Sequence, residues 1–260
     1  MKSDHVIYQK ISGIARLTLN RPEALNTINR DMLKQLDVFL DKIRADDAVH
    51  AVIITGTGNK AFSAGADIGF LSTASALDVR DLARLAVSVY SRIETLGKVV
   101  VAAINGYALG GGLELAEACT LRIAVNGAWL GHPEVRIGAV AGWGGTTRLP
   151  RLIGKGRAAD LLLTGRMISA EEALNIGLVN RVVEPAKLIS ECECLLKEVL
   201  AQSPFAVRLT WEAMHRGLDL NIDESARLGA DYFGLVASTA DFRGGTQAFL
   251  AKQSPVFKGK

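Results

Sequence analysis

The clearest pattern along the chain is an alternation of short apolar stretches with longer segments whose apolar residues recur every three or four positions. Within residues 13–19, Ala15, Leu17 and Leu19 alternate with polar residues, which predicts a half-buried strand. Residues 51–55 are almost wholly apolar and predict a fully buried strand. Strands of both kinds in the first part of the chain indicate a sheet with a substantial covered surface.

Segments with helical spacing separate these strands. Asn29 precedes a run with Leu33, Leu36 and Leu40 at helical spacing, and we expect it to be the N-cap of that helix. Residues 82–93 predict another helix, and the apolar residues 98–104 predict the next strand. The first two-thirds of the chain therefore predicts an α/β fold in which strands and helices alternate.

The next segment carries helix-start and helix-stop signals. Ser169 and Glu172 have the spacing of a capping box, and Gly177 is placed to end the short helix that follows. A strand is expected over residues 178–183.

The last third of the chain is predicted to be helical. Pro185 and Pro204 stand where new helices can begin. We therefore divide the chain into a core domain, residues 1–184, and a helical C-terminal region, residues 185–260. The helices expected there span residues 186–202, 205–216, 223–237 and 240–251.

Two glycine-bearing segments, residues 62–67 and 105–114, are the strongest candidates for chemistry. Glycine lacks a Cβ and tolerates φ > 0, so such segments can turn bare backbone N–H groups toward one point. Fixed N–H donors stabilise the negative charge that develops on a thioester oxygen when a proton is removed from or added to the neighbouring carbon. Glu114 ends the second segment, and Glu134 follows twenty positions later. Donors beside two carboxylates are suited to enolate chemistry.

Each of these features has a plainer interpretation. The triple glycine that ends in Gly112 could be a loop or a tight packing point. Glu114 could lie at the exposed edge of an amphipathic helix, and Glu134 could be an ordinary loop charge after a proline. Asp67 could be a turn or cap residue. Only the combination of the segments favours the catalytic interpretation.

The order and spacing of several segments resemble the crotonase superfamily, and specifically its enoyl-CoA hydratases. The resemblance runs along nearly the whole chain. Its segments are Asn20 to Asn26, Ala61 to Ile68, Ala103 to Leu115, Pro133 and Glu134, Gly144 to Leu149, and Leu163 to Ala170. It implies a spiral of repeated β-β-α turns followed by a helical region that mediates oligomerisation, as a homotrimer or homohexamer. The alternative, that the helical region simply covers its own core, stays open.

The resemblance also implies roles for individual residues. Ala66 and Gly111 correspond to the two oxyanion-hole donors, and Glu114 and Glu134 correspond to the acid and base. Gly142 corresponds to a glycine whose amide helps to position the attacking water.

Substrate binding is implied in the same way. Ala64, Asp67 and Ile68 lie in the strand edge that meets the adenine and pantetheine of coenzyme A, through their backbone. Lys60 and Lys252 match basic positions near the phosphates, although either could equally be a surface charge.

Three residues depart from the family pattern. Glu23 stands where relatives often carry a basic residue, which puts one phosphate contact in doubt. Ala141 stands where proline is common, and Trp143 where small residues are common. Trp143 either trims the acyl pocket or fills core space, and we favour packing.

The function expected from the resemblance is reversible hydration of a 2-enoyl-CoA by a hydro-lyase. A double-bond isomerase or an acyl-CoA hydrolase of the same fold is the alternative. A third possibility is an RNA-binding homologue that uses a lysine-rich helix. The corresponding segment, residues 31–44, mixes Lys34 and Lys42 with Asp37 and Asp41, so we expect a solvated face and no nucleic-acid partner.

Composition sets the remaining expectations. With 260 residues, 49% of them hydrophobic, the chain can bury a large core, and its net charge of +3 is mild. The start of the chain has no apolar signal core and no stretch is long enough to span a bilayer, so we expect a soluble, cytoplasmic protein. A trimmed organellar transit segment stays possible.

No disulfide or metal site is expected. No separate cofactor is expected either, because coenzyme A is part of the substrate. The three cysteines include the pair Cys192 and Cys194, whose side chains would point to different faces of a helix. The four histidines are scattered, and only His132 lies near the proposed chemistry.

Overall fold

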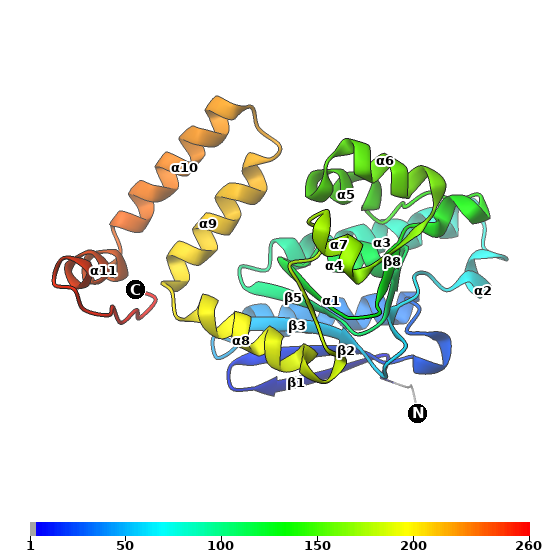
Figure 1. The fold of residues 1–260 in the computed structure, drawn as a ribbon, viewed down its shortest axis with the longest axis horizontal. Coiled ribbons are helices and arrows are strands. Elements are labelled where there is room, and N and C mark those ends of the chain that lie inside the picture. Colours follow the sequence, from blue (N-terminus) through cyan, green and yellow to red (C-terminus); the bar gives the residue numbers. More distant parts are fainter. Residues whose placement is uncertain (1–3) are drawn as a thin grey trace. The chain divides into compact units, whose positions relative to one another are not determined.

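The structure is a computed structural model that describes residues 4–260 (Figure 1). It consists of two compact units, with the division between Cys192 and Glu193. The domain boundary that we predicted from the sequence lies earlier, after residue 184, and it stays a prediction.

The larger of two sheets in the first unit has six strands in the order β1-β2-β3-β5-β7-β10. β1 and β2 are antiparallel, and the other pairs are parallel. Leu17, Ile54 and Ala102 lie side by side in register on β2, β3 and β5, and all three are fully buried. The strands are β1 (Val6–Ile11), β2 (Ile14–Leu19), β3 (Ala51–Gly56), β5 (Val99–Ile104), β7 (Leu121–Val125) and β10 (Arg181–Val183).

The smaller sheet has four short strands in the order β4-β6-β8-β9. β4, β6 and β8 are parallel, and β9 is antiparallel to β8. Successive turns of the chain supply one strand to each sheet, as in the pairs β3 and β4, β5 and β6, and β7 and β8. The strands are β4 (Ala61–Ser63), β6 (Tyr107–Leu109), β8 (Trp129–Gly131) and β9 (Met167–Ser169).

The helices of the first unit follow the predicted positions closely. The Asn29 side chain accepts a hydrogen bond from the Met32 N–H at 2.9 Å and caps α1, as predicted. The helices are α1 (Arg30–Ala45), α2 (Ile68–Leu71), α3 (Ala76–Glu94), α4 (Gly111–Glu117), α5 (Gly145–Ile153), α6 (Lys155–Thr164) and α7 (Ala170–Asn175). Three 3₁₀-helices are η1 (Pro22–Ala24), η2 (Pro133–Ile137) and η3 (Pro185–Lys187).

Two local predictions were wrong in part. Ser169 caps α7 by accepting from the Glu172 N–H, but the Glu172 carboxylate pairs with Arg166 at 2.7 Å, so the reciprocal half of the capping box is replaced by an ion pair. The strand expected from residue 178 begins at Arg181, because the Leu178 N–H donates to a carbonyl at the end of α7 and not to the sheet.

The second unit is helical, as predicted. α9 and α10 contact each other and run side by side (Figure 1). Asp241, at 3% exposure, accepts hydrogen bonds from the N–H groups of Lys258 and Gly259 and from the Ser203 hydroxyl, which pins the last residues of the chain. The helices are α9 (Pro204–Gly217), α10 (Ile222–Ala237) and α11 (Ala240–Leu250), and α8 (Leu188–Leu200) spans the division between the units.

Candidate functional site

Three parallel strands of the smaller sheet end at the same edge and deliver the predicted site residues. β4 leads to Ala66, β6 leads to Gly111 and Glu114, and β8 leads to Glu134. Because β4, β6 and β8 are neighbours in the sheet, residues far apart in the sequence meet beyond their carboxyl ends. The larger sheet contributes none of these residues.

The two glycine segments approach each other too closely to admit side chains. A Cβ on Gly112 would lie 2.3 Å from the Ser63 carbonyl oxygen. A Cβ on Gly65, which has φ of +98°, would lie 3.0 Å from the Leu109 carbonyl oxygen and 3.5 Å from the Gly111 nitrogen. The triple glycine is therefore a packing point, and the packing brings the two predicted donors together.

Both predicted donor N–H groups are free of backbone acceptors within residues 4–260. Ile28 bridges the Ala66 segment by donating to the Gly65 carbonyl and accepting from the Asp67 N–H, which leaves the Ala66 N–H on the other side. Gly111 is the first residue of α4, where an N–H has no partner within the helix.

Two aromatic residues hold the Gly111 peptide in place. The buried Tyr90 hydroxyl donates to the Gly111 carbonyl oxygen at 2.8 Å. A Cβ on Gly111 would lie 2.6 Å from the Trp143 ring, and Trp143 packs edge to face on Tyr90. Arg148 donates to the Trp143 carbonyl and forms a two-point ion pair with Glu94. Trp143 is 7% exposed, which agrees with the packing interpretation.

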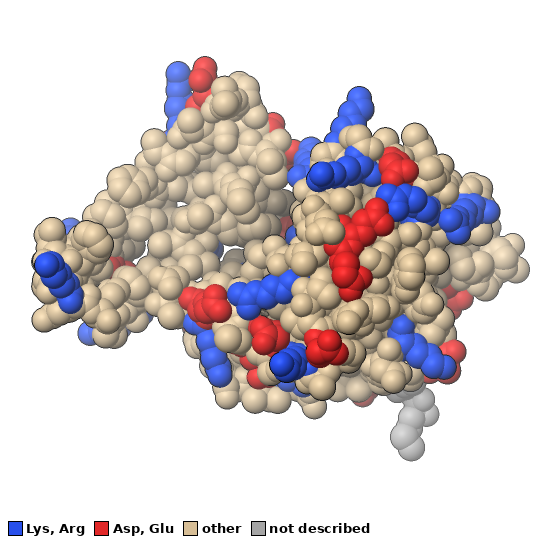
Figure 2. Space-filling model, in the orientation of Figure 1, with Lys and Arg blue, Asp and Glu red and all other residues tan. Residues whose placement is uncertain are grey.

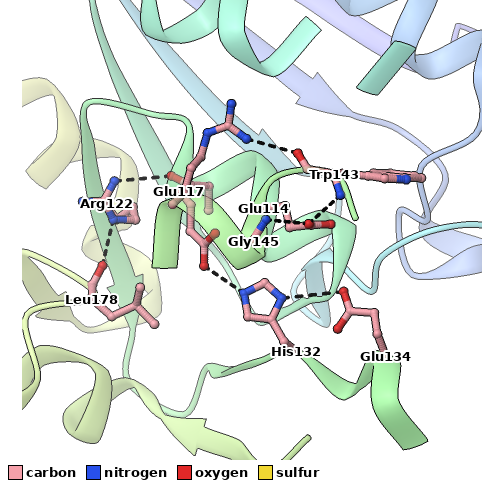
Figure 3. A network of polar contacts seen from close by, with 10 residues as sticks. Glu114, Glu117, Arg122, His132, Glu134, Trp143, Gly145 and Leu178 are labelled. Carbon is pink, nitrogen blue, oxygen red and sulfur yellow. Dashed lines mark hydrogen bonds and ion pairs between the residues drawn. The ribbon is translucent and has the colours of Figure 1, made fainter. Parts of the chain in front are cut away.

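Glu114 is buried, which excludes the exposed-edge interpretation. Its Oε1 accepts hydrogen bonds from the N–H groups of Trp143 at 2.8 Å and Gly145 at 2.7 Å (Figure 3). Burial raises the pKa of its carboxyl to about 7, although the Gly145 N–H and the nearby His132 act in the opposite direction. A carboxyl with this pKa can give or take a proton at neutral pH.

Glu134 lies in η2 and reaches the start of α4. A Cβ on Gly110, the N-cap of that helix, would lie 3.0 Å from the Glu134 Oε1. The Glu134 Oε2 is buried and has no hydrogen-bond partner within the described part of the chain. Glu134 therefore lies in a 3₁₀-helix and not in an irregular loop, and its side chain lies against Gly110, the residue before the predicted donor Gly111.

A buried histidine connects the two acidic elements. The His132 Nε2 lies 2.8 Å from the Glu117 Oε1, and its Nδ1 lies 3.6 Å from the Glu134 Oε1 (Figure 3). Burial acts to lower the His132 pKa, but the charge and hydrogen bond of Glu117, aided by Glu134, raise it to about 10. Sequence reasoning missed Glu117 and Tyr90; only the three-residue spacing between Glu114 and Glu117 hints that they share a helix face.

Two predicted substrate-binding residues of the first unit, Lys60 and Asp67, each line a cleft. Lys60 is exposed and lines a cleft of about 250 Å³ together with Pro22 and Leu25. Asp67 lines a second cleft of about 260 Å³. The Asp67 side chain caps α2 and pairs with Arg21 at 3.1 Å, so the cap interpretation was correct for its carboxylate.

The remaining residues predicted to bind substrate or position water lie in different surroundings. Ala64 donates its N–H to the Leu25 carbonyl, and Ile68 is 53% exposed at the start of α2. Gly142 is exposed, and it is the amides of its neighbours Trp143 and Gly145 that bind Glu114, so its role with water stays a prediction. Lys252 lies in the second unit, just after α11.

Comparison with known proteins identifies the family of this chain. A sequence profile described as enoyl-CoA hydratase/isomerase matches residues 9–260. The chain belongs to this family. It is 43% identical over 260 residues to a crotonyl-CoA hydratase of Syntrophomonas wolfei, with 100% of both chains covered. It is 42% identical to a short-chain-enoyl-CoA hydratase of Clostridium acetobutylicum, with 97% of both chains covered.

Solved structures agree with the sequence relatives. A crystal structure of an enoyl-CoA hydratase from Bacillus anthracis matches with a TM-score of 0.94 at 36% identity, covering 99% of this chain and 100% of that one. The predicted family and fold class are confirmed. The full-length relatives support enoyl-CoA hydratase activity, and with it the enzyme class of hydro-lyases.

The described residues also bear on the predictions about metal sites, cysteines and membrane-spanning helices. Among residues 4–260, no group of three or more His, Cys, Asp or Glu side chains is placed to hold a metal ion. Cys192 is buried and Cys194 is exposed, so their side chains do face different ways, as predicted. Over the same residues, every helix is too short or too polar to cross a bilayer. The cytoplasmic location stays a prediction.

Proposed function

We propose that this chain adds water reversibly to the double bond of a 2-enoyl-CoA through the groups gathered at the first turn of α4. The observation that carries the proposal is the convergence of two N–H donors, Ala66 and Gly111, that are unengaged within residues 4–260, with the buried carboxyl of Glu114 and the partly buried carboxyl of Glu134. The donors suit a developing oxyanion, and the carboxyls suit the proton transfers that accompany it.

In the hydration direction, the Ala66 and Gly111 N–H groups bind the thioester oxygen and accept the charge of the enolate. Glu114 removes a proton from water, whose oxygen bonds to the β-carbon. Glu134 gives a proton to the α-carbon, so that one water is added overall. In dehydration the two glutamates exchange these tasks, as microscopic reversibility requires.

The fixed position of Glu114 supports this division of roles. Its Oε1 is held by two backbone N–H groups, so its remaining oxygen is the one that can orient a water. Its pKa near 7 allows both the ionised and the protonated form at neutral pH. The nearby Glu134 charge also acts to raise the Glu114 pKa, because a like charge disfavours ionisation.

The same proposal extends to the coenzyme A portion. Lys60 and Lys252 would attract its phosphates, and the backbone at Ala64, Asp67 and Ile68 would meet its adenine and pantetheine. Glu23 is exposed in η1 and offers no positive charge there. No cofactor beyond the substrate is needed for this chemistry. The names of the two bacterial relatives favour a short acyl chain, for which the packed Trp143 leaves the site compact.

We further propose that the second unit mediates assembly as a homotrimer or homohexamer. Charged side chains are sparse over α9 and α10 on the face shown in Figure 2. Large exposed apolar side chains occur on the helices α9 to α11 and at their ends, among them Met214, Leu218, Ile222, Phe233, Phe249 and Leu250. Exposed apolar surface of this kind is typical of interfaces.

A nucleic-acid partner is not part of the proposal. The acids Asp37 and Asp41 of α1 both pair with Arg92 of α3, and Lys42 lies over the Tyr8 ring. These contacts show acidic and basic groups mixed along the helix, which differs from the uniformly basic face that binds phosphates.

The test is a product analysis with short 2-enoyl-CoA and 3-enoyl-CoA substrates in labelled water. A hydratase incorporates one labelled oxygen into a 3-hydroxyacyl-CoA and reaches the same equilibrium from either side. An isomerase shifts the 3-enoyl double bond without incorporation, and a hydrolase releases free thiol. Either of these last outcomes, without labelled 3-hydroxyacyl product, would overturn the proposal.

A further inference from the structure

A buried charge cluster lies behind the two proposed catalytic glutamates. The side chains of Glu117 and His132 both have 0% exposure, and the Glu134 side chain has 15%. Figure 3 shows the His132 ring between Glu117 of α4 and Glu134 of η2. Neither Glu117 nor His132 has a task in the hydration steps described above.

With both neighbouring acids ionised, the geometry favours protons on both nitrogens of His132. The Nε2 lies 2.8 Å from one carboxylate oxygen and the Nδ1 lies 3.6 Å from another. A neutral imidazole would donate to one carboxylate and turn a lone pair toward the other, which is repulsive. An imidazolium faces both acids with a proton. The elevated His132 pKa, which follows from the Glu117 and Glu134 charges against the effect of burial, agrees with this.

The same cation lies close to Glu114. A Cβ on Gly145 would lie 2.8 Å from the His132 Cε1 and 3.1 Å from the Glu114 Oε1, so only a glycine separates the two side chains. The His132 charge acts to lower the Glu114 pKa, whereas Glu117 and Glu134 act to raise it. Without the imidazolium, three carboxyls would share a poorly solvated site.

Other charged or titratable groups border the cluster. Arg122 of β7 interacts with Glu117, but its guanidinium donates to the carbonyls of Leu178 and Cys119. Arg148 of α5 is occupied by Glu94, and the Tyr90 hydroxyl of α3 by the Gly111 carbonyl. Among the residues described, His132 is thus the cation that directly faces both the Glu117 and Glu134 carboxylates.

We propose that His132 is a positioning residue: an imidazolium anchored by Glu117 that holds the Glu134 carboxyl group beside Gly110 and favours the ionised form of Glu114. The inference rests on the proposed hydratase function and deepens it. One Glu134 oxygen faces the ring, which leaves the unpartnered Oε2 for the substrate. The anchor and the ring come from α4 and the loop after β8, so they also tie the two acid-bearing elements together.

The first test is a mutant cycle on hydration of a short 2-enoyl-CoA. His132→Gln should lower kcat by about 10- to 100-fold, because a misplaced proton donor loses rate, while KM changes by less than about threefold. Glu117→Gln should have a similar effect through loss of the imidazolium. The double variant should be no slower than the slower single variant, since both changes remove one unit. His50→Gln, at an exposed histidine before β3, is the matched control.

The pH profile separates electrostatic positioning from a merely structural role. Loss of the imidazolium should raise the Glu114 pKa from its value of about 7, so the acidic limb of kcat/KM should move to higher pH in His132→Gln. In Glu117→Gln the shift should be smaller, because loss of the Glu117 charge acts to lower the same pKa. A profile that keeps its wild-type midpoint in His132→Gln, or additive losses in the double variant, would overturn the proposal.

A spectroscopic measurement keeps the proposal testable if a variant folds poorly. Nitrogen NMR of the isotope-labelled resting enzyme at about pH 8, above the ordinary histidine value of 6.5, should show both His132 nitrogens protonated. A neutral His132 at that pH would contradict the inference. If the wild-type enzyme hydrates no enoyl-CoA, the proposed function fails, yet this measurement still decides the charge of His132.

Discussion

The oxyanion side and the acid side of the site are built from the same sheet edge by different means. In the proposed mechanism, Ala66 and Gly111 act through backbone N–H groups, which carry no net charge and are placed by close packing of glycines. Glu114 and Glu134 would act through their side chains, and burial and neighbouring charges set the protonation of Glu114. The first side should therefore be sensitive to steric change and indifferent to pH, whereas the second should respond to both.

The largest expected effect is on the acid side. Glu134→Gln keeps the size of the side chain but removes the proton donor, and hydration should slow by about 10² to 10⁴-fold. Steady-state rates with a short 2-enoyl-CoA measure this effect. Glu171→Gln, at an exposed position of α7, is the control and should keep the wild-type rate. Undiminished hydration by Glu134→Gln would remove that residue from the mechanism.

A steric change on the donor side should be the next largest. Gly111→Ala places a Cβ 2.6 Å from the Trp143 ring and must displace the first turn of α4, with a loss in kcat of about 10² to 10³-fold, as for removal of one oxyanion donor.

Two comparisons sharpen this prediction. The double variant Gly111→Ala with Trp143→Ala should recover part of the rate, because the obstructing ring is gone. Gly156→Ala in α6, where an added Cβ meets nothing within 4 Å, is the matched control. The pH profile of Gly111→Ala should match the wild type; a shifted profile would mean that the two sides are not separable as described.

The pH dependence of folding stability should also distinguish the two sides. The folded-state pKa of Glu114, about 7, lies above its ordinary value of 4.5, so the folded protein binds this proton more tightly. The resulting stabilisation is complete below pH 4.5 and is lost as the pH rises to about 7, in total about 3 kcal/mol. Denaturant unfolding of wild type and Glu114→Gln, at equal protein concentration, should therefore diverge across this pH range. If the unfolding free energies of the two proteins change with pH in parallel, burial does not penalise the ionised form of Glu114.

The smallest expected effect concerns the support of the Gly111 peptide. Tyr90→Phe removes the side-chain donor to the buried Gly111 carbonyl and should reduce the unfolding free energy by about 1 kcal/mol. The rate should fall less than in Gly111→Ala, because the N–H donor itself is kept. Thermal unfolding and hydration assays measure both. A rate loss as large as that of Gly111→Ala would show that the tyrosine hydroxyl, and not packing, orients the donor.

Local sequence signals predicted the local elements well. Asn29 caps α1, and the apolar stripe that contains Leu33 and Leu36 is fully buried, because both depend on neighbours within one helix. Predictions failed where a group a few residues outside the expected pairing competes for the same atoms. Arg166 takes the Glu172 carboxylate from the expected capping box, and the end of α7 takes the Leu178 N–H from the expected strand.

The candidate site divides in the same way. Its glycines and its two glutamates could be named from motif order and spacing, since the backbone freedom of glycine and the acidity of a carboxyl are properties of the residues themselves. Glu117 and Tyr90 could not, because each acts through a contact that only the assembled helices and strands provide.

The sequence by itself determined which groups can donate, accept or ionise, and it assigned them to strands and helices that recur along the chain. Tertiary structure decided that Glu114 is buried, that His132 meets two carboxylates and that two N–H groups stay unengaged. The physical reason is that solvation, charge and hydrogen-bond partners depend on distances across the fold, which parallel strands set by bringing remote segments to one edge.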